Sequence, residues 1–217
     1  MQQYLVEILM KLGIIGGKGK MGRLFQPIFA RYVDEVLPSS DPISIAEKAD
    51  IVIFSVPIAI TPQVIATTVP YIRAEQLLLD FTSLKETPCL AMLKSKASVI
   101  GMHPMFGPSV CSIAHQTIVL CPERPGKWLV WLKALLAEEK AHVLETQPKI
   151  HDEMMAIVQC LVHFTSMVFS ETIRLKGLDP KTLADFASPI YRIQLHVSGR
   201  IMHQSPDLYG AIQFENP

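Results

Sequence analysis

Hydrophobic residues in the first two thirds of the chain fall into short runs that alternate with segments of helical spacing. Four of these runs, LGII, IVIFSV, LLLDF and SVIGM, are apolar almost throughout, as expected of parallel strands covered by helices on both faces. The alternation predicts an α/β domain built on a parallel sheet. The predicted strands lie within residues 11–17, 49–57, 76–83, 97–104, 116–123 and 141–146.

The pattern becomes helical after about residue 146. Residues 151–176 contain no proline or glycine and their apolar positions recur at intervals of three and four, so we predict one long helix that Gly177 ends as a C-cap residue. Asp179 and Pro180 then suit the N-cap and the first position of a further helix. Two more helices are predicted within residues 189–205 and 207–214.

These patterns divide the chain into a first domain at residues 1–147 and a smaller all-helical domain at residues 148–217. A helical domain of about 70 residues cannot bury apolar residues on several faces within itself. We therefore expect it to pack against the first domain and against a second copy of the chain, which would make the protein a homodimer. A monomeric helical cap is the alternative.

The composition favours a small-molecule partner. The chain has 217 residues, and its 20 Lys and Arg are balanced by 20 Asp and Glu, which gives no electrostatic reason to expect nucleic acid or an anionic membrane. The four cysteines form no C-x-x-C pair and no secretory signal precedes them, so we expect a reduced, cytoplasmic protein without a metal site. Glu7 and Lys11 interrupt the apolar opening segment, and we expect no membrane span.

A glycine-rich motif follows the first predicted strand. In GIIGGKGKMG the glycines have the spacing G-x-G-x-x-G and precede a helical pattern, which predicts a Rossmann-type, doubly wound domain that binds a dinucleotide. The first glycine permits a tight turn, the second lets a pyrophosphate approach the backbone, and the third lets the helix pack on the strand. A turn with spare glycines is the alternative. The loop residues expected to bind the cofactor are Gly17, Gly19, Lys20, Met21 and Gly22.

The choice of dinucleotide depends on the segment VDEVLPSSDP, residues 33–42, which should contain a short and poorly defined second strand. At the end of this strand, about 20 residues after the glycines, an acidic side chain usually meets the ribose. Asp41 is the best-placed carboxylate, although Ser39 and Ser40 could instead face a 2′-phosphate. No Arg or Lys lies between Arg31 and Lys48 to pair with such a phosphate, which favours NAD and does not exclude NADP.

Polar side chains follow three other predicted strands. Ligands of open parallel sheets bind beyond the carboxyl ends of the strands, so Ser83 and His103 are candidates to converge over one crevice. A neutral imidazole there could take a proton from a substrate hydroxyl while a hydride leaves the same carbon. A satisfied structural histidine is the alternative reading of His103. At the carboxyl end of the strand predicted within residues 49–57 we expect cofactor contacts from Ser55, Val56 and Pro57.

These motifs together resemble one family. GGKGKMG, ADIVIFSVPI, LLLDFTSLK, VIGMHPMFGPS, HDEMMAIVQCLVHF, SPIYRIQLHVSGRI and LYGAIQFENP follow one another as in prephenate dehydrogenases, especially those of bacteria that are fused to chorismate mutase. The resemblance implies NAD-dependent oxidative decarboxylation of prephenate to 4-hydroxyphenylpyruvate, on the route to tyrosine. An arogenate dehydrogenase and a non-catalytic dinucleotide-binding relative are the alternatives.

The resemblance also implies roles for single residues. His103 would hydrogen-bond the ring hydroxyl of the substrate, Ser83 would assist, and Arg200 would bind a carboxylate of the substrate. A dianion calls for fixed positive charge, and a guanidinium meets a carboxylate through two parallel hydrogen bonds. Arg192 lies eight residues before Arg200, near two helical turns, so both can face one side of a helix and Arg192 is a second candidate. A structural arginine is the alternative for each.

Two histidines and four departures complete the comparison with the family. The family places histidines near the substrate at the positions of His151 and His163, so we expect both to support substrate binding. The segment between the glycine loop and ADIVIF is shorter than usual, and Cys160 stands where many relatives carry histidine. No chorismate mutase segment precedes the motifs, so we expect the dehydrogenase activity alone. Relatives continue past ENP with further helices, whereas this sequence stops at Pro217, so we expect a shortened helical domain.

Overall fold

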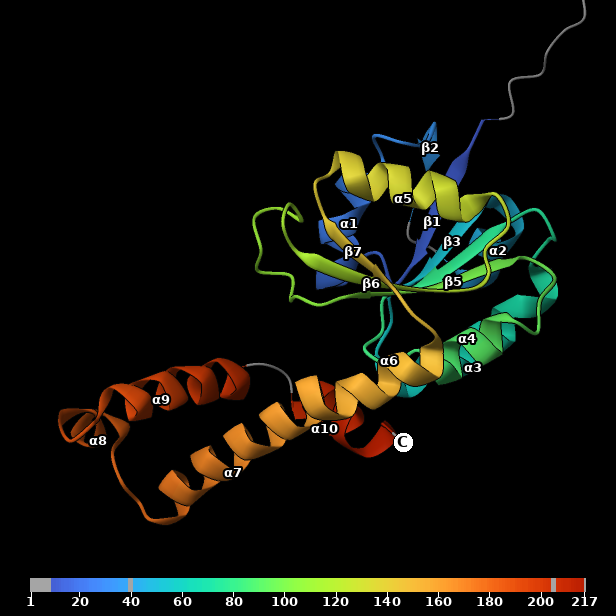
Figure 1. Ribbon diagram of the computed structural model, residues 1–217. Coiled ribbons are helices and arrows are strands. Elements are labelled where there is room, and N and C mark those ends of the chain that lie inside the picture. The colour runs from blue at the N-terminus through green and yellow to red at the C-terminus, as the bar shows by residue number, and fades with distance from the viewer. Residues whose placement is uncertain (1–8, 39–40, 204–205, 217) are drawn as a thin grey trace, which may run out of the picture. The chain divides into compact units, whose positions relative to one another are not determined.

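The computed structural model describes residues 9–38, 41–203 and 206–216. The chain forms two compact units, residues 1–151 and residues 152–217. The first unit is the α/β part and the second is wholly helical (Figure 1).

The first unit is built on a seven-stranded sheet in the order β2-β1-β3-β4-β5-β6-β7 (Figure 1). All the strands predicted from apolar runs are present, and the pairs from β2 to β5 are parallel, which confirms the α/β prediction. The strands are β1 (Lys11–Ile15), β2 (Glu35–Val36), β3 (Ile51–Phe54), β4 (Leu77–Asp80), β5 (Ser98–Pro104), β6 (Thr117–Arg124) and β7 (His142–Glu145).

One strand pair departs from the predicted parallel arrangement. β6 runs antiparallel to β5, and β7 then runs parallel to β6. The reason lies in the connection, because residues 105–116 between β5 and β6 contain no helix. A parallel neighbour needs a long crossover, usually a helix, whereas an antiparallel neighbour does not.

Helices cover both faces of the sheet, which explains why its central strands β1, β3, β4 and β5 are almost wholly apolar. Ile53 of β3 packs into one buried cluster with Phe25 of α1 (Lys20–Phe29) and Leu132 of α5 (Trp128–Glu138). The preceding Val52 packs on the other face, in a cluster with residues of the remaining helices. The helices and short 3-10 turns of that face are α2 (Pro42–Lys48), η1 (Ile58–Ile60), α3 (Thr61–Thr68), η2 (Val69–Tyr71) and α4 (Glu86–Met92).

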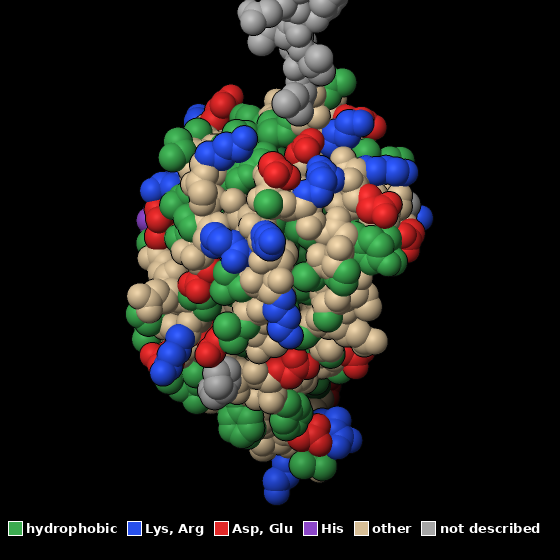
Figure 2. All heavy atoms as spheres, turned by 90° about the vertical axis from the view of Figure 1, so that its right-hand side faces the viewer, with side chains coloured by type: hydrophobic (Ala, Val, Ile, Leu, Met, Phe, Trp, Pro, Cys, Tyr) green, Lys and Arg blue, Asp and Glu red, His purple; other side chains and the backbone are tan. Residues whose placement is uncertain are grey.

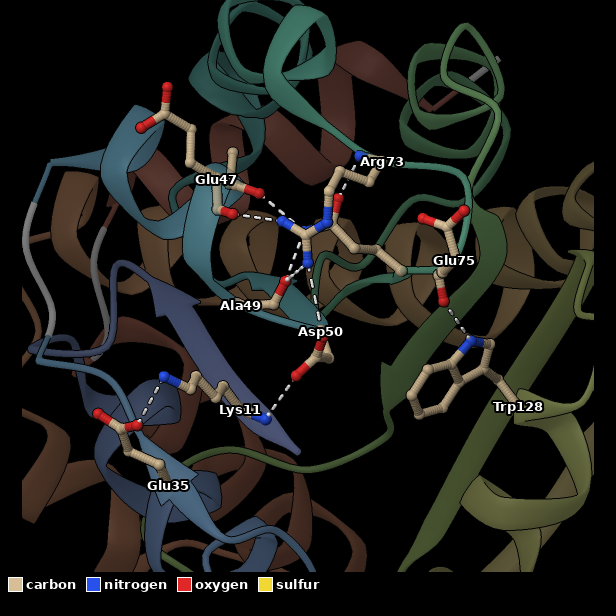
Figure 3. Close-up of polar contacts among 10 residues, drawn as sticks. Lys11, Glu35, Glu47, Ala49, Asp50, Arg73, Glu75 and Trp128 are labelled. Carbon is tan, nitrogen blue, oxygen red and sulfur yellow. Dashed lines mark hydrogen bonds and ion pairs between the residues drawn. The ribbon is translucent and has the colours of Figure 1, made fainter. Parts of the chain in front are cut away.

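A polar network fastens the strands at their amino-terminal edge. The carboxylate of Asp50, just before β3, accepts a hydrogen bond of 2.8 Å from the backbone N–H of Lys11 at the start of β1. Arg73 donates to the carbonyls of Glu47 and Ala49 and lies against the same carboxylate (Figure 3). These contacts hold neighbouring strands in register at the edge opposite the glycine loop.

The second unit continues a helix that begins in the first. α6 (Pro148–Met155) passes through a π-helical segment, η3 (Ala156–Leu161), into α7 (Val162–Leu175). The predicted long helix is therefore confirmed, but it begins earlier and contains a π segment that the apolar spacing did not indicate. Gly177 follows with a positive φ of 63°, as expected of a C-cap glycine.

Three more helices follow in the described part of the second unit, as predicted. The side chain of Asp179 accepts a hydrogen bond from the backbone N–H of Lys181 and caps the first of them, with Pro180 at its first position. The helices are α8 (Pro180–Asp185), α9 (Pro189–Met202) and α10 (Pro206–Glu215).

Much apolar surface of the second unit is uncovered. Phe186 and Phe214 are 85% and 90% exposed, and apolar side chains of α7, α9 and α10 line an open groove of about 800 Å³. The continuous helix Pro148–Leu175 has 28 residues and a window with a mean hydropathy of 1.3, so by length and composition it could cross a membrane, the one such helix in the described chain. Helices at the interface of two soluble subunits have the same properties.

The charged surface shows no field of a single sign on the face drawn in Figure 2, where basic and acidic side chains are interspersed with apolar ones. This distribution agrees with the equal numbers of basic and acidic residues in the sequence.

Candidate active site

The carboxyl ends of four parallel strands are aligned by their register. Ile15 of β1 pairs with Phe54 of β3, Phe54 with Asp80 of β4, and Asp80 with Gly101 of β5. The glycine loop follows Ile15 directly, and His103 lies two residues beyond Gly101 in the same strand. The strand order reverses between β2 and β3, on either side of β1, so the loop lies at the switch point where open α/β sheets bind ligands.

The glycine loop is shaped so that no side chain fills it. Gly16 has a φ of +85°, and a Cβ there would lie 2.3 Å from the carbonyl oxygen of Ser55, so the tight turn occurs one residue before the motif that the sequence indicated. A Cβ on Gly22 would lie 2.6 Å from the Cα of Gly17, which shows how closely α1 approaches the turn. Gly19 is the N-cap of α1, and its N–H donates a hydrogen bond of 2.8 Å to the carbonyl of Gly16.

This loop fits a dinucleotide pyrophosphate. The helix α1 begins at Lys20 with no acidic residue in its first turn, so its N-terminal N–H groups and partial positive charge can face an anion. Met21 is half-buried against the cluster that α1 contributes to. Ser55 leaves β3 beside the loop, and its N–H donates 2.8 Å to the carbonyl of Ile15. Val56 is half-buried and Pro57 is exposed after it.

The proposed ribose carboxylate has a structural role of its own. Asp41 is the N-cap of α2, where its Oδ2 accepts a hydrogen bond of 2.9 Å from the N–H of Ser44. Ser39 and Ser40, the alternative phosphate contacts, lie outside the described residues. The choice between NAD and NADP stays a prediction.

His103 is buried beside a second histidine. It is 3% exposed, and its Nδ1 lies 2.9 Å from Nε2 of His151, which is 1% exposed and belongs to α6. The ring centroids are 5.1 Å apart and the rings are inclined by 68°. The sequence suggested a functional role for each histidine but not that the two would touch, because they lie 48 residues apart.

A buried ion pair, Asp80 with Lys85, lies close enough to His103 to affect its charge. The ammonium group of Lys85 contacts the carboxylate of Asp80 and donates 3.1 Å to the carbonyl of Met102, and both charged side chains are fully buried. Burial lowers the pKa of His103 well below its ordinary value of 6.5, and His151 and the charge of Lys85 lower it further. His103 is therefore neutral at pH 7, with one of its two ring nitrogens unprotonated.

Gly101 makes room for this arrangement. A Cβ on Gly101 would lie 2.7 Å from Sγ of Cys89 and 3.0 Å from Cδ of Lys85. Oδ1 of Asp80 is buried without a hydrogen-bond partner among the described residues, so an unused hydrogen-bond acceptor lies at the end of β4. Ser83 is half-buried in the turn between β4 and α4, three residues after Asp80.

In the second unit the candidate residues gather around a tyrosine. The ring of His163 lies 4.6 Å from that of Tyr209 at 79°, and Nδ1 of His163 is buried with no hydrogen-bond partner among the described residues. Burial lowers the pKa of His163. Burial also raises the pKa of Tyr209, and the charge of Arg200 is close enough to oppose that shift. The sequence pattern did not single out Tyr209, although it follows Arg200 by nine residues within the LYGAIQF motif.

Two other positions of interest have structural contacts. The guanidinium of Arg192 donates 3.0 Å to the carbonyl of Ala184, which ties α9 to the end of α8. The thiol of Cys160 lies 3.2 Å from the carbonyl of Ile212 and so contacts α10. Arg200 is exposed in the last turn of α9. Arg200 and His103 belong to different units, so their meeting in one cleft stays a prediction.

The glycine loop at the switch point of a mostly parallel sheet defines a dinucleotide-binding domain, and a buried neutral histidine at the same edge suits an oxidoreductase. No cluster of three or more side chains suited to a metal ion occurs among the described residues. Residues 31–145 match the family model described as prephenate dehydrogenase, nucleotide-binding domain, and residues 147–217 match the prephenate dehydrogenase dimerization domain. The chain belongs to the prephenate dehydrogenase family.

Curated relatives support the same membership. A protein of Methanocaldococcus jannaschii called probable arogenate/prephenate dehydrogenase is 41% identical over 181 residues, which are 81% of this chain and 41% of that protein. The T-protein of Haemophilus influenzae is 35% identical over 215 residues, which are 93% of this chain and 55% of that protein. The chain thus spans about half the length of the curated relatives it matches.

Solved structures share the fold. Prephenate dehydrogenase of A. aeolicus, crystallised with hydroxyphenyl propionate and NAD+, aligns with a TM-score of 0.75 at 17% identity, covering 96% of this chain and 83% of that one. Arogenate dehydrogenase of Synechocystis aligns with a TM-score of 0.66 at 19% identity, covering 95% of this chain and 84% of that one.

Proposed function

We propose that the chain is an NAD-dependent dehydrogenase that converts prephenate to 4-hydroxyphenylpyruvate by oxidative decarboxylation. The observation that carries the proposal is the buried, neutral imidazole of His103 at the carboxyl edge of the sheet that also bears the glycine loop. The nicotinamide, when bound, accepts the hydride. The family membership supports the class of reaction.

The chain's own residues would bind and orient the substrate and move one proton. His103 takes the proton of the ring hydroxyl, so the oxygen can form a carbonyl as the hydride and carbon dioxide leave. Ser83 assists at the same hydroxyl. Arg200 holds a carboxylate through paired hydrogen bonds, and His163 and Tyr209 add polar contacts beside it. Because Arg192 is bonded to a neighbouring carbonyl, its part in binding is the secondary one.

The cofactor would lie along the glycine loop. Gly17, Gly19 and Gly22 with the start of α1 hold the pyrophosphate, and Ser55 with the two residues after it lies beside the bound dinucleotide. Asp41 is our candidate for the ribose, and NAD is preferred because Arg and Lys are absent between Arg31 and Lys48.

The substrate is tested by comparing turnover. Protein and NAD are mixed with prephenate or with arogenate, and the absorbance of reduced nicotinamide is followed for each. Faster turnover of prephenate supports the proposal, and turnover of arogenate alone would make the enzyme an arogenate dehydrogenase. The second substrate is included because the Methanocaldococcus jannaschii relative is called probable arogenate/prephenate dehydrogenase. Dinucleotide binding without turnover of either substrate would favour a non-catalytic role.

We also propose that the protein is a cytoplasmic homodimer whose helical unit forms the interface. The match to a dimerization domain and the exposed apolar side chains of the second unit support a second copy as the covering surface of the long helix. Light scattering after size-exclusion chromatography without detergent should give twice the mass of one chain, 24.2 kDa. Recovery only with detergent would favour a membrane-bound helix.

A further inference from the structure

The contact between the two buried histidines constrains where their protons lie. Nδ1 of His103 and Nε2 of His151 are 2.9 Å apart, a hydrogen-bond distance that requires one hydrogen between them. A neutral imidazole carries its single hydrogen on one nitrogen and a lone pair on the other. When both rings carry a single hydrogen, they can share this contact in one of two ways.

The two ways give His103 opposite chemistry at its second nitrogen. If Nδ1 of His103 carries the hydrogen and donates to His151, then Nε2 of His103 is an acceptor. If Nε2 of His151 carries it, then Nε2 of His103 must carry its own hydrogen and cannot take a proton from a substrate. The partner thus decides whether His103 is a base.

We propose that His151 is a positioning residue that accepts the Nδ1 hydrogen of His103 and thereby fixes Nε2 of His103 as the proton acceptor. This inference rests on the proposed function only for the identity of the proton that Nε2 receives. It replaces the expectation that His151 supports the substrate directly, since its ring is 1% exposed and is engaged with another ring.

The same contact serves the protonated state. When Nε2 of His103 takes a proton, the imidazolium keeps its Nδ1 hydrogen and with it the hydrogen bond to His151. Burial and the charge of Lys85, which is paired with Asp80, lower the pKa of His103 and so favour its neutral form after the proton has been passed on. His151 thus orients the ring through the contact at Nδ1.

Nitrogen NMR of the histidine rings tests the tautomer without turnover. In protein labelled with ¹⁵N-histidine at pH 7.5 to 8, the wild-type His103 ring should show a protonated Nδ1 and an unprotonated Nε2, assigned with His103→Asn. The amide oxygen of His151→Gln can accept the same hydrogen, so that variant should keep this tautomer. His151→Leu cannot accept it and should lose it. Protonated Nε2 on His103 in the wild type would overturn the proposal.

Kinetics separate positioning from substrate binding. His151→Leu should lower kcat about 10- to 100-fold with KM within about twofold of wild type, as expected of a misplaced base, and His151→Gln should recover most of the rate. The exposed His142 supplies the control, and His142→Leu should change neither constant. A raised KM with unchanged kcat in His151→Leu would make His151 a substrate ligand. If no substrate turns over, the proposed function fails while the tautomer still decides the inference.

Discussion

Replacing Gly22 by alanine should weaken dinucleotide binding through a backbone clash. The added Cβ would lie 2.6 Å from the Cα of Gly17, 2.8 Å from its carbonyl oxygen and 2.9 Å from its carbonyl carbon. Ordinary van der Waals contact begins at 3.4 Å, so the first of these contacts requires α1 and the turn to separate by about 0.8 Å. Because all the atoms met belong to the backbone, no side chain can rotate away.

The shift has a calculable effect on affinity. A hydrogen bond near 2.9 Å that lengthens by about 0.8 Å is effectively lost. Charge-assisted hydrogen bonds are worth about 1.5–3 kcal/mol, so the loss of one between the loop and a pyrophosphate weakens binding about 10- to 150-fold. Strain in the packed turn should lower the free energy of unfolding by about 1–3 kcal/mol as well.

Calorimetric titration with NAD measures the affinity, and chemical denaturation measures the stability. Gly19→Ala, whose Cβ would meet the carbonyl oxygen of Gly16 at 3.1 Å, should show a smaller loss. Gly210→Ala is the matched control, since a Cβ there meets nothing within 4 Å, and it should bind NAD as the wild type does. Wild-type affinity in a folded Gly22→Ala protein would refute the close approach of helix and turn.

Three further predictions concern stability. The pKa of His103 and that of His163 are lowered in the folded protein, so the unfolded chain binds more protons and stability should fall as pH drops below about 6.5, measured by denaturant titration; a rise would contradict the burial of neutral rings. Asp50→Ala should lower the free energy of unfolding by about 1–3 kcal/mol and leave NAD affinity unchanged. A loss of NAD affinity would contradict the location of the Asp50 network at the edge opposite the glycine loop. Gly101→Ala should lower the free energy of unfolding by about 1–3 kcal/mol, and adding Cys89→Ala should restore part of it, because the added Cβ meets Sγ of Cys89. Strictly additive effects of the two substitutions would show that this contact does not form.

The periodicity of apolar residues predicted most of the fold because it reports which faces of an element are buried. Val52 and Ile53 are both apolar since helices cover the two faces of β3, and the structure places them in separate clusters. The direction of β6 could not be predicted in the same way, because parallel and antiparallel strands with two buried faces have the same composition. Only the connection after β5 indicates the antiparallel direction, because it contains no crossover helix.

The candidate site was predictable where chain order dictates position. The glycine loop and His103 follow strands that end at one edge, so their common location follows from topology. The contact between His103 and His151 could not be predicted because the two residues lie 48 positions apart and meet only through tertiary packing. The burial of Asp80 and Lys85 could not be predicted because these residue types are almost never fully buried. The left-handed turn at Gly16, within a run of two glycines, likewise needed coordinates.

The most direct test of the proposed chemistry is the rate of nicotinamide reduction by wild type and by His103→Asn, each saturated with NAD and prephenate after equal NAD affinity has been shown. Loss of a general base costs about 10²- to 10⁴-fold in rate, so we predict turnover by the wild type and a variant slower by that factor. Equal rates for the two proteins would remove His103 from the reaction and contradict the proposed mechanism.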